Sequence, residues 1–171
     1  MQAQQDLLAE IPRLRRYARA LTGDRTRADD LVQDTLERAL GRWRLWRPGN
    51  LRAWLMTIMH NLFVNELRAN TLVEYRDDAA LPEHPVRSAQ TDSLELRDLE
   101  RALQSLPAEQ REVLLLVGLE ELAYEEVARI VGVPIGTVMS RLSRARSRLR
   151  SLMSGTEPRP TTGAAHLRVV K

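Results

Sequence analysis

The sequence predicts an all-α protein built from two small helical domains joined by a flexible linker. Apolar residues recur at helical spacing in two regions, no segment alternates apolar and polar residues as a strand does, and the stretch between the regions has no periodicity. These observations divide the chain into a three-helix N-terminal bundle (1–70), a linker (71–93), a C-terminal helix-turn-helix domain (94–153) and a disordered tail (154–171).

Three helices are predicted in the first region, over about Leu7–Leu21, Ala28–Trp43 and Leu51–Arg68. Gly23 and Asp24 end the first helix, and Thr26 with Asp29 resembles a capping box that starts the second. Asn50 follows a Pro-Gly breaker and is a good N-cap for the third helix.

Helical periodicity resumes at Leu94 and continues to Leu103, and Pro107 suits the first position of a helix that runs to Val117. Two further helices are expected at about Tyr124–Val131 and Ile135–Met153. Between them, Ala128, Gly132 and Val138 have the spacing of a helix-turn-helix: a small residue for close approach, a glycine for the turn and a branched residue for packing.

Composition limits the function classes. The 171 residues include 26 basic and 23 acidic side chains, a formal net charge of +3, and every basic residue except Lys171 is arginine. The preference for arginine has two explanations. One is a GC-rich genome, and the other is a need for guanidinium groups that bind phosphates and guanine edges. Composition does not decide between them.

The chain has no cysteine, which excludes disulfides and thiolate metal sites. His60, His84 and His166 stand far apart, so we expect no metal and no cofactor. No apolar run is long enough to span a bilayer and the N-terminus lacks a signal-peptide pattern, so the sequence predicts a soluble, cytoplasmic protein without membrane insertion.

The last predicted helix is a candidate recognition helix for duplex DNA. It is rich in arginine and no acidic residue lies between Arg129 and Ser154. Its early positions Thr137, Ser140, Arg141 and Arg144 are expected to be exposed, where arginine can contact guanine O6 and N7, while later arginines contact phosphates. The alternative is an ordinary solvated basic helix.

The second predicted helix has an acidic face, because Asp30, Asp34 and Glu37 share one side with Gln33. Such a surface does not suit DNA. It is either a solvated helix face or a docking surface for a basic protein partner.

The segment before the third helix interleaves arginine and tryptophan, as surfaces that hold single strands and stack bases do. Its members include Arg44, Trp46 and Arg47, and Asn61 adds an amide on the following helix. The alternative is that Trp54 and one of the other tryptophans belong to the hydrophobic core, and for Trp54 the pattern favours this alternative.

These segments together resemble the extracytoplasmic-function (ECF, group 4) RNA polymerase sigma factors. Residues 28–35 (ADDLVQDT) resemble the family's polymerase-binding helix, residues 51–68 its −10 helix, and residues 106–113 (LPAEQREV) with 136–146 its −35 domain. The resemblance covers about residues 5–153, with the motifs in the family's order.

The resemblance implies a sigma-2-like domain, a sigma-4-like domain and a role in transcription initiation, with core RNA polymerase (β′ clamp helices and β flap), promoter DNA and a cognate anti-sigma factor as partners. It implies three sets of site residues. Core polymerase would be bound by Asp30, Gln33, Asp34 and Glu37; the melted −10 strand by Arg44, Trp46, Arg47, Asn50, Trp54, Asn61 and Asn65; and the −35 duplex by Thr137, Ser140, Arg141, Ser143, Arg144 and Arg148. Ser143 is small where a larger side chain can reach DNA, and the 42–50 loop is idiosyncratic, so the promoter sequence stays open.

The implied promoter elements lie about 25 base pairs apart, roughly 85 Å of duplex. A linker of about 21 residues extends to roughly 70 Å, and the two domains add about 20 Å. The linker would therefore be nearly stretched when both elements are bound.

Three other functions fit the sequence less well. A sigma-like decoy that sequesters an anti-sigma factor would not need the basic recognition helix, and an ordinary helix-turn-helix repressor would leave the N-terminal motifs unexplained. No paired carboxylates, nucleophile–base pair or phosphate loop indicates an enzyme, and no small-molecule substrate is expected.

Overall fold

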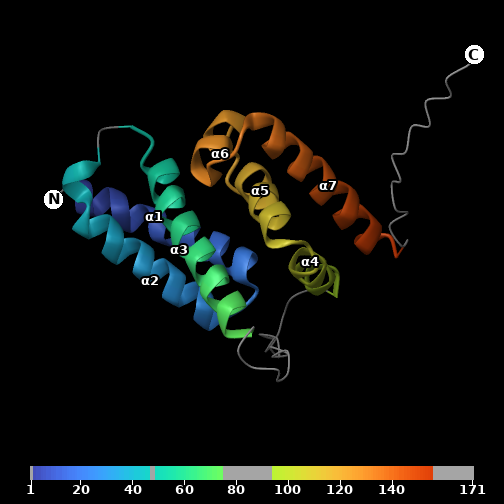
Figure 1. Ribbon diagram of the computed structural model, residues 1–171. Coiled ribbons are helices and arrows are strands. Elements are labelled where there is room, and N and C mark those ends of the chain that lie inside the picture. The colour runs from blue at the N-terminus through green and yellow to red at the C-terminus, as the bar shows by residue number, and fades with distance from the viewer. Residues whose placement is uncertain (1, 47–48, 75–93, 156–171) are drawn as a thin grey trace, which may run out of the picture.

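The computed structural model describes residues 2–46, 49–74 and 94–155, and these residues form helices and turns with no strand (Figure 1). The α-helices are α1 (Gln2–Thr22), α2 (Arg25–Gly41), α3 (Leu51–Glu74), α4 (Leu94–Gln104), α5 (Ala108–Gly118), α6 (Tyr124–Val131) and α7 (Ile135–Met153), with a short 3₁₀ helix at Trp43–Leu45. The all-α prediction is confirmed. Most of the predicted linker (75–93) and of the predicted tail (156–171) lies outside the described residues.

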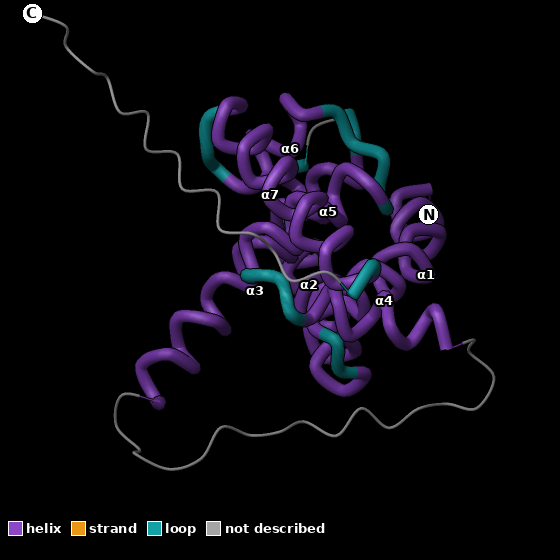
Figure 2. Tube along the Cα trace, turned by 90° about the vertical axis from the view of Figure 1, so that its right-hand side faces the viewer, coloured by secondary structure: helices purple, strands orange, loops and turns teal. Residues whose placement is uncertain are grey.

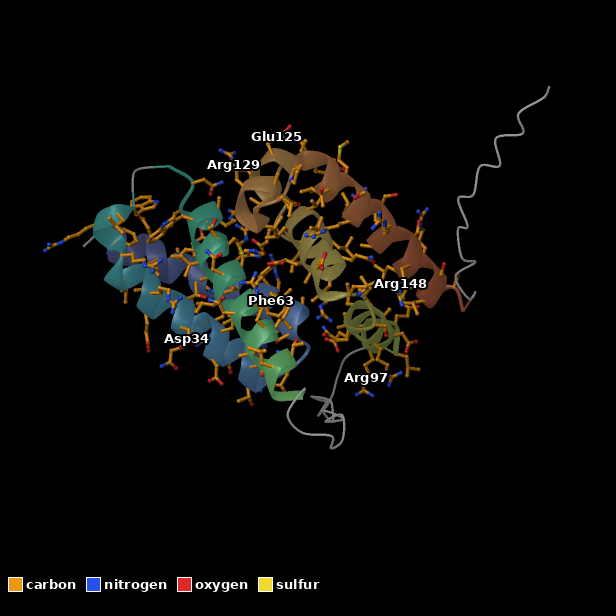
Figure 3. All side chains as sticks on the ribbon, viewed as in Figure 1. Asp34, Phe63, Arg97, Glu125, Arg129 and Arg148 are labelled. Carbon is orange, nitrogen blue, oxygen red and sulfur yellow. The ribbon has the colours of Figure 1, made fainter. Side chains whose placement is uncertain are left out.

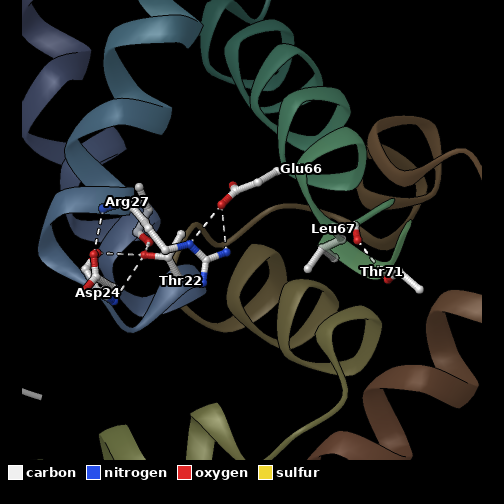
Figure 4. Close-up of polar contacts among 7 residues, drawn as sticks. Thr22, Asp24, Arg27, Glu66, Leu67 and Thr71 are labelled. Atoms are coloured by element: carbon white, nitrogen blue, oxygen red, sulfur yellow. Dashed lines mark hydrogen bonds and ion pairs between the residues drawn. The ribbon is translucent and has the colours of Figure 1, made fainter. Parts of the chain in front are cut away.

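The first three helices form one half of the molecule, with α2 packed on both α1 and α3. Their inward faces carry the expected periodic apolar residues, and Leu14, Leu55 and Phe63 are at most 1% exposed. Helix α3 continues to Glu74, beyond the predicted end at Arg68. No glycine or proline interrupts residues 69–74, and Thr71 Oγ1 donates to the Leu67 carbonyl at 2.9 Å within this extension (Figure 4).

The start of α2 differs from the prediction because its N-cap is Asp24 rather than Thr26. The Asp24 carboxylate accepts a hydrogen bond of 2.8 Å from the Arg27 backbone N–H (Figure 4). The guanidinium of Arg27 in turn contacts Glu66 Oε1 at 2.9 Å through both Nε and Nη2, which ties α2 to α3. Asp24 therefore fixes the first turn that places this interhelical ion pair.

Replacing Asp24 with alanine is expected to lower the free energy of unfolding by about 1 kcal/mol, because a backbone donor of α2 loses its cap. Urea denaturation followed by circular dichroism measures the change. The matched substitution Thr26→Ala, at an exposed position that does not cap the helix, is expected to change stability by less than about 0.5 kcal/mol. A larger loss from Thr26→Ala than from Asp24→Ala would restore the original capping prediction.

The last four helices form the other half, in which α7 packs on α4, α5 and α6. Pro107 is the N-cap of α5, one residue before its predicted place inside the helix. Gly132 ends α6 in the left-handed region (φ 68°) and its N–H donates to the Ala128 carbonyl at 2.9 Å. Val138 and Leu142 then bury α7 against the neighbouring helices, so the predicted helix-turn-helix is confirmed.

The two halves pack directly against each other, which the sequence did not predict. Helix α1 contacts α4 and α5, and α3 contacts α6 (Figures 1 and 2). One hydrophobic cluster continues across the boundary, from Tyr17 of α1 to Val113 and Leu116 of α5. The buried core therefore belongs to both halves in this conformation.

Candidate functional site

The acidic face of α2 consists of Asp30, Gln33, Asp34 and Glu37, and all four side chains are exposed. The opposite face of α2 is anchored in the core by Leu31, Val32 and Thr35, which fixes the direction of these carboxylates. Gln33 Nε2 donates to Glu37 Oε1 at 2.9 Å, and Asp34 projects from α2 in Figure 3. The structure thus brings the four predicted residues together as one anionic surface available to a cationic partner.

A cluster of three tryptophans lies at the entry to α3. The ring centroids of Trp43 and Trp46 are 5.0 Å apart, and those of Trp46 and Trp54 are 6.5 Å apart. All three side chains are half-buried, so Trp54 is neither a fully buried core residue nor a free platform. Half-exposed aromatic faces of this kind can stack on unpaired bases.

Polar residues surround the tryptophan cluster. Asn50 caps α3, because its Oδ1 accepts from the Ala53 N–H at 3.1 Å. Arg44 is exposed, and Asn61 and Asn65 are exposed one turn apart on α3, along the same helix stripe as Trp54. Arg47 lies outside the described residues. The described members of the predicted −10 set therefore gather around the start and one side of α3.

Helix α7 exposes a basic surface. Ser143, Arg144 and Arg148 are exposed, as are Arg146 and Arg150, and Figure 3 shows Arg148 on the half of the molecule that does not carry Asp34. Thr137 and Ser140 are half-buried, and the Ser140 hydroxyl donates to the Thr137 carbonyl at 3.0 Å. The exposed side of the helix thus offers guanidinium groups and small hydroxyls, the side chains that contact phosphates and base edges.

Three residues of α7 that were expected to be exposed are not. Thr137 and Ser140 are half-buried. The Arg141 side chain is only 23% exposed, and its Nη2 lies 2.7 Å from Glu109 Oε2 on α5. Met139 was not singled out from the sequence, yet it is 52% exposed on the first turns of α7. The helical phase of Met139 relative to buried Val138 and Leu142 could have identified it. An exposed thioether there can contact the methyl group of thymine.

The boundary between the halves contains a polar cluster that sequence reasoning missed. Its second-half members are the boundary carboxylates Glu112, Glu120 and Glu126. Glu120 is fully buried, and its oxygens lie 3.4 Å from Arg13 Nε and 4.0 Å from Arg16 Nη2. Burial raises the pKa of Glu120, although Arg13 and Arg16 act in the opposite direction.

The other boundary carboxylates also meet donors of the first half. Glu112 Oε1 lies 2.7 Å from His60 Nδ1 of α3, and Glu126 Oε1 accepts from Asn50 Nδ2 at 2.9 Å. Each of the three boundary carboxylates thus faces a cationic or donor group of the first half. The described residues contain no group of three or more His, Cys, Asp or Glu side chains that could hold a metal ion.

None of the described helices is both long and apolar enough to cross a membrane.

Each half of the molecule matches a known protein family. Residues 7–60 match the family model for the sigma2 domain of PhyR, and residues 96–149 match the model for sigma-70 region 4. The ECF RNA polymerase sigma factor EcfG of Rhodopseudomonas palustris is 45% identical over 150 residues, which are 86% of this chain and 83% of the relative.

Similar solved structures include two that contain an anti-sigma factor. The sigma factor RpoE of Bartonella quintana, in complex with the anti-sigma factor NepR, has a TM-score of 0.81 at 39% identity, over 90% of this chain and 97% of that one. The anti-anti-sigma factor PhyR of the same organism, also bound to NepR, has a TM-score of 0.55 over 84% of this chain and 48% of PhyR. At 19% identity, the second likeness is one of fold.

Proposed function

The chain belongs to the ECF RNA polymerase sigma factors, and we propose that it binds core RNA polymerase and directs it to promoters through two DNA-reading surfaces. The observation that carries this proposal is the separation of opposite charges: an exposed acidic face on α2 and an exposed basic face on α7, in different halves. A protein that docks on another protein and on DNA at once needs both surfaces.

The acidic face of α2 is the proposed docking surface for core polymerase. Asp30, Gln33, Asp34 and Glu37 would contact basic residues of the β′ clamp helices, and the second half would contact the β flap. The four side chains are exposed in one row, which supports a role beyond solvation. Because polymerase is the partner, the site of action would be the cytoplasm.

Helix α7 is the proposed reader of the −35 duplex. Exposed Arg144 is suited to a guanine edge and Arg148 to a phosphate, with Ser143, Thr137 and Ser140 beside them. Arg141 is paired with Glu109, and reading a base edge would break that ion pair. Arg141 is therefore proposed to contact the phosphate backbone of the DNA and so to position α7 rather than to read a base. Met139 adds an apolar contact that suits thymine.

The tryptophan cluster is the proposed holder of the melted −10 strand. Trp46 and Trp54 would stack on an unpaired base, while Asn50, Asn61 and Asn65 would donate to base edges and Arg44 and Arg47 to phosphates. In this division the first domain is 1–70 and the second 94–153, although α3 itself continues to Glu74.

Replacing Arg144 with alanine is expected to reduce −35-dependent transcription about 5- to 150-fold, because one guanidinium–guanine contact contributes about 1–3 kcal/mol. Core binding should stay unchanged. Run-off transcription and a fluorescence-anisotropy titration with core polymerase measure the two properties. Arg129→Ala, which removes an exposed arginine from α6, is the matched control. Loss of core binding by Arg144→Ala would refute the assigned role.

Control by an anti-sigma factor is part of the proposal. The similar RpoE structure is a complex with the anti-sigma factor NepR, and this chain matches it over nearly its whole length. A small protein of that kind is therefore the expected inhibitor of this chain.

A second candidate function is a decoy for an anti-sigma factor. It is favoured by the match of residues 7–60 to the sigma2 domain of PhyR, which is described as an anti-anti-sigma factor. A decoy has no use for five exposed side chains of DNA-binding type on α7 (Ser143, Arg144, Arg146, Arg148 and Arg150). Binding of labelled chain to purified core polymerase separates the two functions: a sigma factor forms the complex, whereas a decoy binds the anti-sigma protein alone.

A further inference from the structure

Helix α7 has two flanks of different chemistry, which lie on either side of its buried face. The buried face is formed by Val138 and Leu142. The residues of each flank are spaced so that they form one stripe along the helix. The polar flank consists of Thr137, Arg141, Arg144 and Arg148, and the mixed flank consists of Met139, Ser143, Arg146 and Arg150. Only the mixed flank therefore begins with an apolar side chain.

Met139 lies near the end of α7 that enters the major groove in helix-turn-helix proteins. Its side chain is 52% exposed, although methionine is among the residues most often found buried. Ile135, one turn earlier, is exposed as well. The core does not use these two side chains, because Val138, Leu142 and Ala145 already bury α7. An exposed apolar patch at this end of the helix suits contact with a partner.

A shallow groove of about 300 Å³ runs beside Met139, where α6 packs on α7 (Figure 1). Tyr124, at the start of α6, contributes an aromatic ring to it. The residues of α7 that line the groove are Met139, Leu142, Ser143, Arg146 and Arg150. The groove thus combines apolar surface with two guanidinium groups, which suits a small apolar group carried by an anionic molecule.

We propose that the 5-methyl group of a thymine in the −35 element packs against Met139 in this groove, so that Met139 determines the base preferred at that position. The inference rests on the proposed function and deepens it by giving the mixed flank its own base contact. Thymine is the only standard base that presents a methyl group in the major groove. An apolar contact there distinguishes thymine from the other three bases without a hydrogen bond.

The charge of the mixed flank favours DNA over a protein as the molecule that carries this group. No acidic residue lies between Arg129 and Ser154. Arg146 and Arg150 follow Met139 along the same stripe, about 10 Å and 16 Å further along the helix axis. Both are exposed and suited to backbone phosphates, which position a helix in the groove without reading sequence. Phosphate contacts on this flank would hold Met139 against the base edges.

Replacing the contacted thymine with uracil is expected to lower promoter-specific transcription by the wild-type chain about threefold to fourfold. Uracil lacks the methyl group and keeps the hydrogen-bonding edges of thymine, so the change isolates the proposed contact. A fourfold change corresponds to about 0.8 kcal/mol, which is the contribution of one buried methyl-sized group.

Run-off transcription with core polymerase tests the proposal. Each thymine of the −35 element, on both strands of a transcribed promoter, is replaced by uracil one at a time. Met139→Gln keeps the length of the side chain but makes it polar, so this variant should transcribe the thymine and uracil promoters equally well. Met153→Gln is the matched control, because Met153 is 45% exposed at the other end of α7. It should keep the wild-type ratio of thymine to uracil transcription.

Three results would overturn the proposal. The first is equal transcription of all uracil-substituted promoters by the wild-type chain, and the second is an unchanged uracil effect in Met139→Gln. The third is weaker binding of Met139→Gln to core polymerase with an unchanged ratio, which would make the groove a protein contact. In all three cases the wild-type chain still transcribes and the proposed function stands. If no promoter gave chain-dependent transcripts, the proposed function would fail and this inference with it.

Discussion

Asp34→Arg is expected to abolish binding to core RNA polymerase, with at least about a hundredfold increase in Kd. The substitution replaces an exposed carboxylate in the middle of the acidic face with a cation that faces a basic partner. Losing one charge pair and creating a repulsive one at an interface costs about 2–5 kcal/mol, and a hundredfold change corresponds to about 2.7 kcal/mol. Titration of labelled chain with core polymerase measures the affinity.

The fold should survive this substitution, because Asp34 is exposed and its neighbours on the buried face are unchanged. Glu125→Arg makes the same charge change on the exposed side of α6 and serves as the control (Figure 3). It should bind core polymerase like the wild type. Normal binding by Asp34→Arg, with unchanged circular dichroism, would show that the docking surface lies elsewhere.

Phe63→Ala is expected to produce the largest loss of stability, about 3–5 kcal/mol in the free energy of unfolding. Phe63 is the only phenylalanine of the chain and is 1% exposed, so truncation leaves a cavity in the core of the first three helices. Urea denaturation gives the change as a shift in midpoint at constant slope.

The control for this loss lies about two and a half turns further along α3. Leu72 is 70% exposed, so Leu72→Ala should change stability by less than about 0.5 kcal/mol. A loss below about 1 kcal/mol for Phe63→Ala would contradict the packing described for the first half.

Local patterns predicted the helices and much of the candidate site. The periodicity of residues 124–153 predicted both helices of the helix-turn-helix, because nearby residues determine this structure. Gly132 adopts the left-handed conformation that ends α6, and Val138 lies on the buried side of α7. The exposure of the acidic face also followed from helical phase alone, since Asp30, Asp34 and Glu37 share one side.

Contacts between distant segments were not predictable from these patterns. Asn50 and Glu126 are 76 residues apart in sequence, and His60 and Glu112 are 52 apart. Arg141 was assigned to the exposed face by its place on α7, but its partner Glu109 comes from α5. The position of a charged side chain within its own helix does not identify the residue that another helix brings to it.

The capping error has a similar origin. Thr26 and Asp29 have capping-box spacing, but Asp24 lies two residues earlier and reaches the Arg27 N–H. Both residues suit the N-cap chemically, and the tertiary ion pair of Arg27 with Glu66 favours the earlier start.

Run-off transcription from a pooled promoter library, using purified chain with and without bacterial core polymerase, tests the sigma-factor assignment most directly. Discrete start sites that appear only when both components are present are the predicted result, and their upstream sequences would reveal the −35 and −10 elements. The same background transcripts with and without the chain, from a folded protein, would contradict the assignment and favour the decoy.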